Sequence, residues 1–118
     1  MYRLERLEVW KAGNRLARAA YQLTVLSPLD RHFGLADQIR RAAVSIPANL
    51  AEGYGLGTTP QFVRCLRMAL GSAYELRVHL EVARDMDLVA NESSESALVL
   101  ANEVVRMLIG MLKGLQRR

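Results

Sequence analysis

The fold depends first on QIRRAAVSIPANLAEG, residues 38–53, which has the pattern of a helix packed on several sides. Its apolar side chains recur at helical spacing and form one stripe, made of Ile39, Ala43, Ile46 and Leu50. Small side chains fill most of the remaining circumference, which allows neighbouring helices to approach closely. The pattern predicts a central helix over about residues 34–52.

Pro47 lies inside this predicted helix. Proline donates no hydrogen bond to the carbonyl of Ala43, and its ring crowds that carbonyl, so we expect a kink or short break near Ser45 and Ile46. An interior proline costs about 3 kcal/mol in a plain helix, so tertiary packing has to offset this cost. A packing kink is favoured here over a functional hinge.

Three more helices are predicted from apolar residues that recur three and four positions apart. They span about residues 7–26, 60–86 and 92–115. The reversals between helices are short, so the sequence predicts one all-α domain, residues 1–118, folded as an up-down-up-down antiparallel four-helix bundle. The aromatic content of 6% indicates a core of Leu, Val, Ile, Ala and Met.

The glycines of residues 53–57 and the single Gly71 carry specific expectations. Residues 53–57, GYGLG, are predicted to cap the second helix and reverse the chain. A phosphate-binding loop is not expected, because no strand precedes these glycines and no Gly-Lys-Ser/Thr follows them. Gly71 lies inside the third predicted helix, where glycine costs roughly 1 kcal/mol relative to alanine, so we expect a close backbone contact there.

Two ordered motifs carry a family resemblance. QIRRAAVSIPANLAEGYG at residues 38–55, followed by F-x-x-x-L-x-x-A-x-G-S-x-x-E-L at residues 62–76, resembles the four-helix-bundle family of the 23S rRNA intervening-sequence protein. LEVWKAGNRLA at residues 7–17 fits the first helix of that family. The family is similar to the accessory variability determinant of diversity-generating retroelements, which implies a basic pentamer that binds nucleic acid and a reverse transcriptase. The motif positions Pro47, Glu52, Gly53, Gly71 and Glu75 are interpreted as structural.

Catalytic and metal-binding patterns are weak in this chain. Glu75 and His79 are four residues apart, not the three of di-iron bundle motifs, and His32 lies in a loop. Glu52 and Glu75 are expected to satisfy donors from neighbouring helices. Cys65 has no partner histidine close in sequence, so we expect an inert thiol. We predict a protein without enzymatic activity, cofactor or metal.

The fourth predicted helix carries two apolar stripes. The second of them contains Leu100, Val104, Met107 and Met111. One bundle core buries only one such stripe, so we expect this second stripe to contact another subunit or a partner helix. The surplus apolar surface predicts a homo-oligomer. The number of five subunits comes from the resemblance alone.

The charge and cysteine content of the sequence indicate the kind of partner and the cellular compartment. Sixteen Lys and Arg residues against twelve Asp and Glu give a net charge of +4 and a pI near 9.7, which suits an anionic partner. Cys65 is the only cysteine, so an internal disulfide is excluded and the cytoplasm is the expected compartment. Charged residues interrupt the apolar residues 97–115, so no membrane span is expected.

Arginines supply the candidate binding residues. Arg40 and Arg41 are adjacent, and Arg64 and Arg67 lie three residues apart on one helix face. If both pairs meet on one rim of an oligomer, their repeated charge forms a surface for nucleic acid, with RNA the expected ligand. The alternative is that these arginines pair with nearby acids such as Asp37. In that case the protein is a scaffold or an accessory subunit that holds a partner enzyme.

Overall fold

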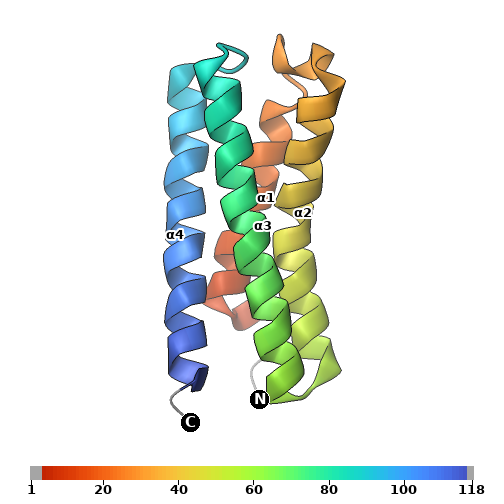
Figure 1. Cartoon of the computed structure of the whole chain (residues 1–118), viewed down its shortest axis with the longest axis vertical. Helices are drawn as coiled ribbons and strands as arrows, with labels where there is room; N and C mark the ends of the chain where they lie inside the picture. Colours follow the sequence, from red (N-terminus) through yellow and green to blue (C-terminus); the bar gives the residue numbers. More distant parts are fainter. Residues whose placement is uncertain (1–3, 117–118) are drawn as a thin grey trace.

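The computed structural model describes residues 4–116, and in them the chain forms four long α-helices (Figure 1). This confirms the predicted all-α class with four helices. Two short 3₁₀ turns precede α1 and α2. The elements in chain order are η1 (Leu4–Arg6), α1 (Glu8–Leu23), η2 (Leu29–Arg31), α2 (Phe33–Leu56), α3 (Thr59–Asp85) and α4 (Asn91–Gln116).

The helices lie side by side in a bundle of 46 × 20 × 20 Å. Chain direction alternates from one helix to the next (Figure 1), so the start of α1, the turn between α2 and α3 and the end of α4 lie at one end. α2 and α3 form the most extensive helix pair, and α1 and α4 each pack against both of their neighbours. The core between them is built mainly from Leu and Ala side chains.

The first helix is shorter than predicted. It ends at Leu23, and Val25 and Leu26 are exposed instead of continuing the helix. Thr24 follows α1 directly, is fully buried, and donates a hydrogen bond from its hydroxyl to the carbonyl of Tyr21 at 2.6 Å. This side-chain bond competes with the next helical turn and helps to end the helix.

The second helix is longer than predicted, because Gly53 and Gly55 are helical. The prediction that the glycines from Gly53 onward form the reversal is therefore wrong. Only Gly57, at φ 80°, takes the left-handed conformation that ends α2. Gly53 serves close packing instead: a Cβ placed on it would lie 2.7 Å from the Cβ of Cys65 in α3.

Pro47 does not break α2. The helix continues through it, so the short break expected near Ser45 is not found. Two side chains supply extra hydrogen bonds around the proline: Ser45 Oγ donates to the carbonyl of Ala42 at 2.8 Å, and Asn49 Nδ2 donates to the carbonyl of Ser45 at 2.7 Å. Together with core packing on both sides, these bonds offset the lost backbone bond.

The burial of Val104 and the exposure of Gly71 contradict two further predictions. Val104 is fully buried in the core, so it does not belong to an exposed second stripe on α4. The buried residues of α4 cover more of its circumference than one heptad seam requires. Gly71 is exposed, and a Cβ placed on it would meet nothing within 4 Å, so the expected close backbone contact is absent among residues 4–116.

Candidate nucleic-acid interface

Arg40 is held inside the bundle by α1. Its Nε donates to the hydroxyl of Thr24 at 2.8 Å, and its Nη2 donates to the Thr24 carbonyl at 3.2 Å. The guanidinium carbon lies 5.4 Å from the centre of the Tyr21 ring. Arg40 thus places a positive charge at the C-terminal end of α1, where the helix dipole favours it. Its Nε and Nη2 donors are thus engaged in holding the end of α1 against α2.

Arg41 is the exposed member of that pair. Its Nε donates to Asp37 Oδ2 at 2.9 Å, one turn back along α2. The predicted alternative of an Asp37–Arg41 surface pair is therefore the arrangement found. Both side chains are more than half exposed, so solvent weakens this ion pair.

The two arginine pairs lie toward opposite ends of one molecule. Arg40 and Arg41 are in the first third of α2, and Arg64 and Arg67 are in the first third of α3, which runs the other way. At a rise of 1.5 Å per residue, they are about 16 Å apart along the bundle axis. The structure does not bring all four together on one chain.

Arg64 and Arg67 instead belong to a basic part of the surface. We call the half of the bundle with the α2–α3 turn, residues 4–16, 45–71 and 104–116, the turn end. It is the lower half of the bundle in Figure 1. Three of its residues are acidic, Glu5, Glu8 and Glu52. Seven are basic, and all seven are exposed: Arg6, Lys11, Arg15, Arg64, Arg67, Arg106 and Lys113.

The other half of the bundle, residues 17–44 and 72–103, has the opposite charge balance. We call it the loop end. Nine of its residues are Asp or Glu and six are Arg. Four of those arginines have acceptors within the chain: Arg40 on Thr24, Arg41 on Asp37, Arg77 on Asn102 at 3.2 Å, and Arg84 on Asp85 at 3.1 Å. The bundle is therefore polarised along its length, basic at the turn end and acidic at the loop end.

Arg64 and Arg67 are poorly neutralised. Of the side chains that the structure describes, no carboxylate oxygen lies within 4.0 Å of either guanidinium. Arg64 Nη1 instead lies 3.6 Å from the sulfur of Met68. Lys11 differs, since its Nζ lies 3.3 Å from Glu8 Oε1. Both arginines thus keep their donors available for an anion that approaches the turn end.

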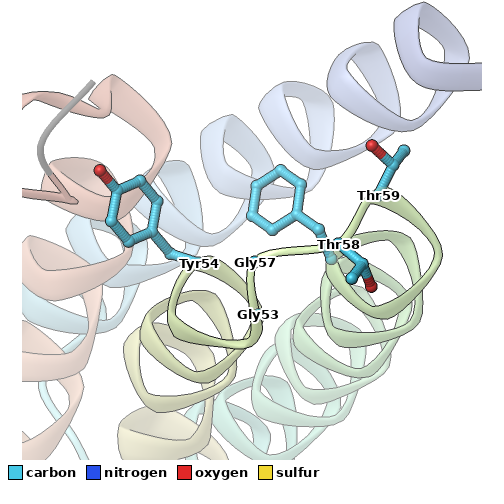
Figure 2. Close-up of a pocket in the computed structure, with 6 residues that line it drawn as sticks. Gly53, Tyr54, Gly57, Thr58 and Thr59 are labelled. Carbon is cyan, nitrogen blue, oxygen red and sulfur yellow. The ribbon is translucent and has the colours of Figure 1, made fainter. Parts of the chain in front are cut away.

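A cavity of about 180 Å³ opens at the turn end, between the end of α2 and the start of α3 (Figure 2). Sequence reasoning treated its residues as a turn and did not predict a cavity. Its lining residues are Gly53, Tyr54, Gly57, Thr58, Thr59 and Phe62. Thr58 caps α3: its hydroxyl accepts from the backbone N–H of Gln61 and donates to Gln61 Oε1. A second hollow lies on α4 at the loop end and includes Glu92 and Glu95.

The carboxylates that the motifs singled out do not form a reactive group. Glu75 Oε1 lies 3.2 Å from Nε2 of His79, one turn along α3, on the outer surface. Glu52 is exposed on α2. Cys65 is a fully buried thiol against Gly53. In residues 4–116, no three His, Cys, Asp or Glu side chains gather closely enough to hold a metal ion.

Apolar side chains are exposed along the outer face of α3. The outer stripe consists of Met68, Val78 and Val82 of α3 and of Met86, which caps its C-terminus, and each is at least 40% exposed. Gly71 lies on the same face. Of the residues predicted for an α4 interface, Leu100, Met107 and Met111 are partly buried against the core. The larger unpartnered apolar surface is thus on α3 and not on α4.

No helix within residues 4–116 combines the length and the apolar character that crossing a bilayer requires.

The sequence from residue 5 to residue 110 matches the family model of the 23S rRNA-intervening sequence protein. The chain belongs to this family. The predicted resemblance is confirmed over nearly the whole chain. No curated protein sequence matches this chain.

A solved structure supports the same assignment. It is the 1.70 Å crystal structure of a protein with unknown function from the S23 ribosomal protein family of Bacteroides thetaiotaomicron. The two chains are 27% identical, and their structures align with a TM-score of 0.80 over 89% of this chain and 98% of the other. The family relationship thus defines the fold and leaves the activity to be argued from the surface of the bundle.

Proposed function

We propose that this member of the intervening-sequence family is a non-enzymatic protein that binds nucleic acid, RNA in particular, through the basic turn end. The observation that carries the proposal is the excess of exposed basic side chains at this end. Phosphate groups gain both Coulomb attraction and hydrogen bonds from arginine, and counterions released from the nucleic acid add to the affinity. Arg64 and Arg67 are the proposed central contacts.

The four predicted arginines have unequal parts in this proposal. Arg40 is engaged with Thr24 and Arg41 with Asp37, so a phosphate would compete with existing partners there. Arg64 and Arg67 have no such carboxylate among the described side chains. Of the four predicted arginines, we therefore centre the proposed contact surface on Arg64 and Arg67, at the start of α3.

The proposed function also includes association of several copies of this chain. We infer a homo-oligomer, with the five subunits of the resemblance as the expected number, because the outer stripe of α3 leaves Val78 and Val82 exposed. A repeated turn end multiplies a modest charge into a larger positive surface. We expect the protein in the cytoplasm, since its single cysteine, Cys65, is a buried free thiol.

The test is fluorescence anisotropy of a labelled RNA, measured with wild-type protein and with the double variant Arg64→Gln, Arg67→Gln. Affinity for nucleic acid falls with salt, with a slope of roughly 0.7–0.9 for each phosphate engaged. We expect the double variant to bind more weakly and to reduce this slope by roughly 1.4–1.8 for each subunit in contact.

The matched control removes the same charge at the loop end, through Arg18→Gln and Arg31→Gln. Both control residues are exposed arginines, so net charge changes equally in the two double variants. The proposal requires the control to keep the wild-type slope. Equal weakening by both double variants would mean that binding follows net charge alone. Absence of RNA binding by wild-type protein, even at low salt, would refute the function.

A protein scaffold is the second candidate, and the outer stripe of α3 is the observation that favours it. Four exposed apolar side chains along one helix suit a partner helix as well as a second copy of this chain. The expected result is that a partner enzyme stays bound after nuclease treatment and is lost with Val78→Glu. Loss of all partners on nuclease treatment would contradict the scaffold and favour binding through nucleic acid.

A further inference from the structure

The cavity between α2 and α3 has the dimensions and lining of a site for one flat ring. Its volume is about 180 Å³, and a cavity of about 150 Å³ suffices to hold benzene. Gly53 and Gly57 contribute only backbone to its wall, which leaves the space open. Two aromatic side chains, Tyr54 and Phe62, complete the apolar part of the lining.

The two rings are held differently. Phe62 packs against the core, and its Cδ1 lies 3.1 Å from the position that a Gly53 Cβ would take, so its ring rests on the α2 backbone. Tyr54 is half-buried at the end of α2, and Figure 2 shows it on the opposite side of the cavity from Thr59. Each ring therefore keeps part of its surface toward the cavity.

The polar groups at this site suit a ring with a hydrogen-bonding edge. Thr58 and Thr59, at the start of α3, both line the cavity, and each carries a hydroxyl group. Thr58 Oγ1 is already bonded to Gln61, which fixes the cap, so Thr59 offers the more adaptable hydroxyl. A nucleobase has an apolar π-face and a polar edge, and this combination matches the lining.

The positive charge around the cavity favours a ligand in which the flat ring is attached to anionic groups. The cavity lies in the turn end, where seven exposed basic residues outnumber three acidic ones. Arg64 follows Phe62 by two residues on α3, and Arg67 lies one turn further. Both arginines therefore lie within about 8 Å of Phe62 along the axis of α3, a separation that the phosphates next to a bound base can span.

We propose that the cavity takes one unstacked base of a single-stranded nucleic acid, with the base stacked on Tyr54 and the flanking phosphates on Arg64 and Arg67. The inference rests on the proposed function and makes it specific, because a paired duplex cannot offer a free base. Stacking on an aromatic ring tolerates any base, so the site reads strandedness and not sequence.

The test compares Tyr54→Leu, which keeps an apolar side chain but removes the π-face, with Tyr54→Phe, which keeps the ring. The probes are a labelled single-stranded RNA, a duplex of the same sequence, and a matched strand in which every nucleotide lacks its base. Tyr54→Leu is expected to weaken single-strand binding roughly 5- to 150-fold, the usual loss for one stacked base. Tyr54→Phe is expected to bind like wild type.

Three further expected results belong to the same experiment. Duplex binding does not change with Tyr54→Leu, and the salt slope of single-strand binding stays at the wild-type value, because no phosphate contact is lost. The strand without bases binds wild type and Tyr54→Leu equally. Melting followed by circular dichroism verifies that both Tyr54 variants are folded.

Each contrary outcome has a distinct meaning. If wild type binds RNA and Tyr54→Leu binds it equally well, the cavity proposal fails and the proposed function stands. If wild type binds no nucleic acid, both fail. An acidic peptide carrying one phenylalanine that binds more tightly than the RNA, and loses its affinity with Tyr54→Leu, would overturn the proposal in favour of a peptide ligand.

Discussion

Replacing Gly53 and Gly71 by alanine is expected to change stability in opposite directions. Both glycines are inside long helices, so alanine gains about 1 kcal/mol of helix propensity at either position. At Gly71 nothing lies within 4 Å of the new Cβ. The Gly71→Ala variant is therefore expected to be more stable than wild type by about 1 kcal/mol.

At Gly53 the new methyl group meets α3. It would lie 2.7 Å from the Cβ of Cys65 and 3.1 Å from Cδ1 of Phe62. The Cys65 Cβ is fixed to the α3 backbone, so no side-chain rotation relieves the contact and the two helices have to separate. Overpacking of this kind costs about 1–3 kcal/mol, and the upper part of that range applies here. After the propensity gain, Gly53→Ala is expected to lose about 2 kcal/mol.

The assay is urea unfolding at several protein concentrations, since association adds a concentration-dependent contribution to stability. The two variants should differ by about 3 kcal/mol, and at typical slopes this separates their midpoints by at least about 1 M urea. Gly110→Ala is a further control, because its site is also open. Equal midpoints for Gly53→Ala and wild type would refute the close α2–α3 contact. A destabilised Gly71→Ala would place Gly71 at a contact between subunits.

Two other substitutions test single contacts by the same unfolding assay. Arg40→Ala leaves the buried Thr24 without its donors and should cost about 1–3 kcal/mol, whereas Arg41→Ala removes an exposed pair and should cost less than about 1 kcal/mol. Similar losses for both would contradict the internal role of Arg40. Thr58→Ala removes the α3 cap and should cost about 1 kcal/mol, and Thr59→Ala should cost clearly less.

Periodicity predicted the helices well because core burial repeats every three to four residues. Ile39, Ile46 and Leu50 are all fully buried, as their stripe indicated. Helix ends were harder to predict, because they depend on single contacts between helices. The glycines show this: Gly53 was read as a turn residue, but its close contact with Cys65 depends on where α3 lies.

The candidate site was less predictable than the fold. Adjacent arginines in sequence, Arg40 and Arg41, proved to have unrelated environments, because one faces α1 and the other faces solvent. The basic residues of the turn end come from η1, α1, α3 and α4, so no local motif reveals them. Once the antiparallel order of the helices is known, however, the charges of the sequence can be assigned to the two ends. The distribution of charge between the two ends is therefore the sequence feature that points to the basic turn end.

The polarity of the bundle makes the symmetry of any assembly a determinant of binding. In a cyclic ring with parallel bundles, every turn end faces the same way, and the positive charges of the subunits add on one face. In an isologous pair with antiparallel bundles, each turn end lies beside a loop end and the charges largely cancel. A ring should therefore bind RNA with a steeper salt slope than a single subunit.

Val78→Glu provides the comparison, because it places a charge in the outer stripe of α3 without touching the turn end. If α3 forms the ring contact, this variant should become smaller by light scattering and its salt slope should fall toward that of one subunit. Val99→Glu, at an equally exposed site on α4, should leave mass and slope unchanged. A smaller Val78→Glu assembly that keeps the full slope would mean that each subunit binds independently, and the ring would then have no part in recognition.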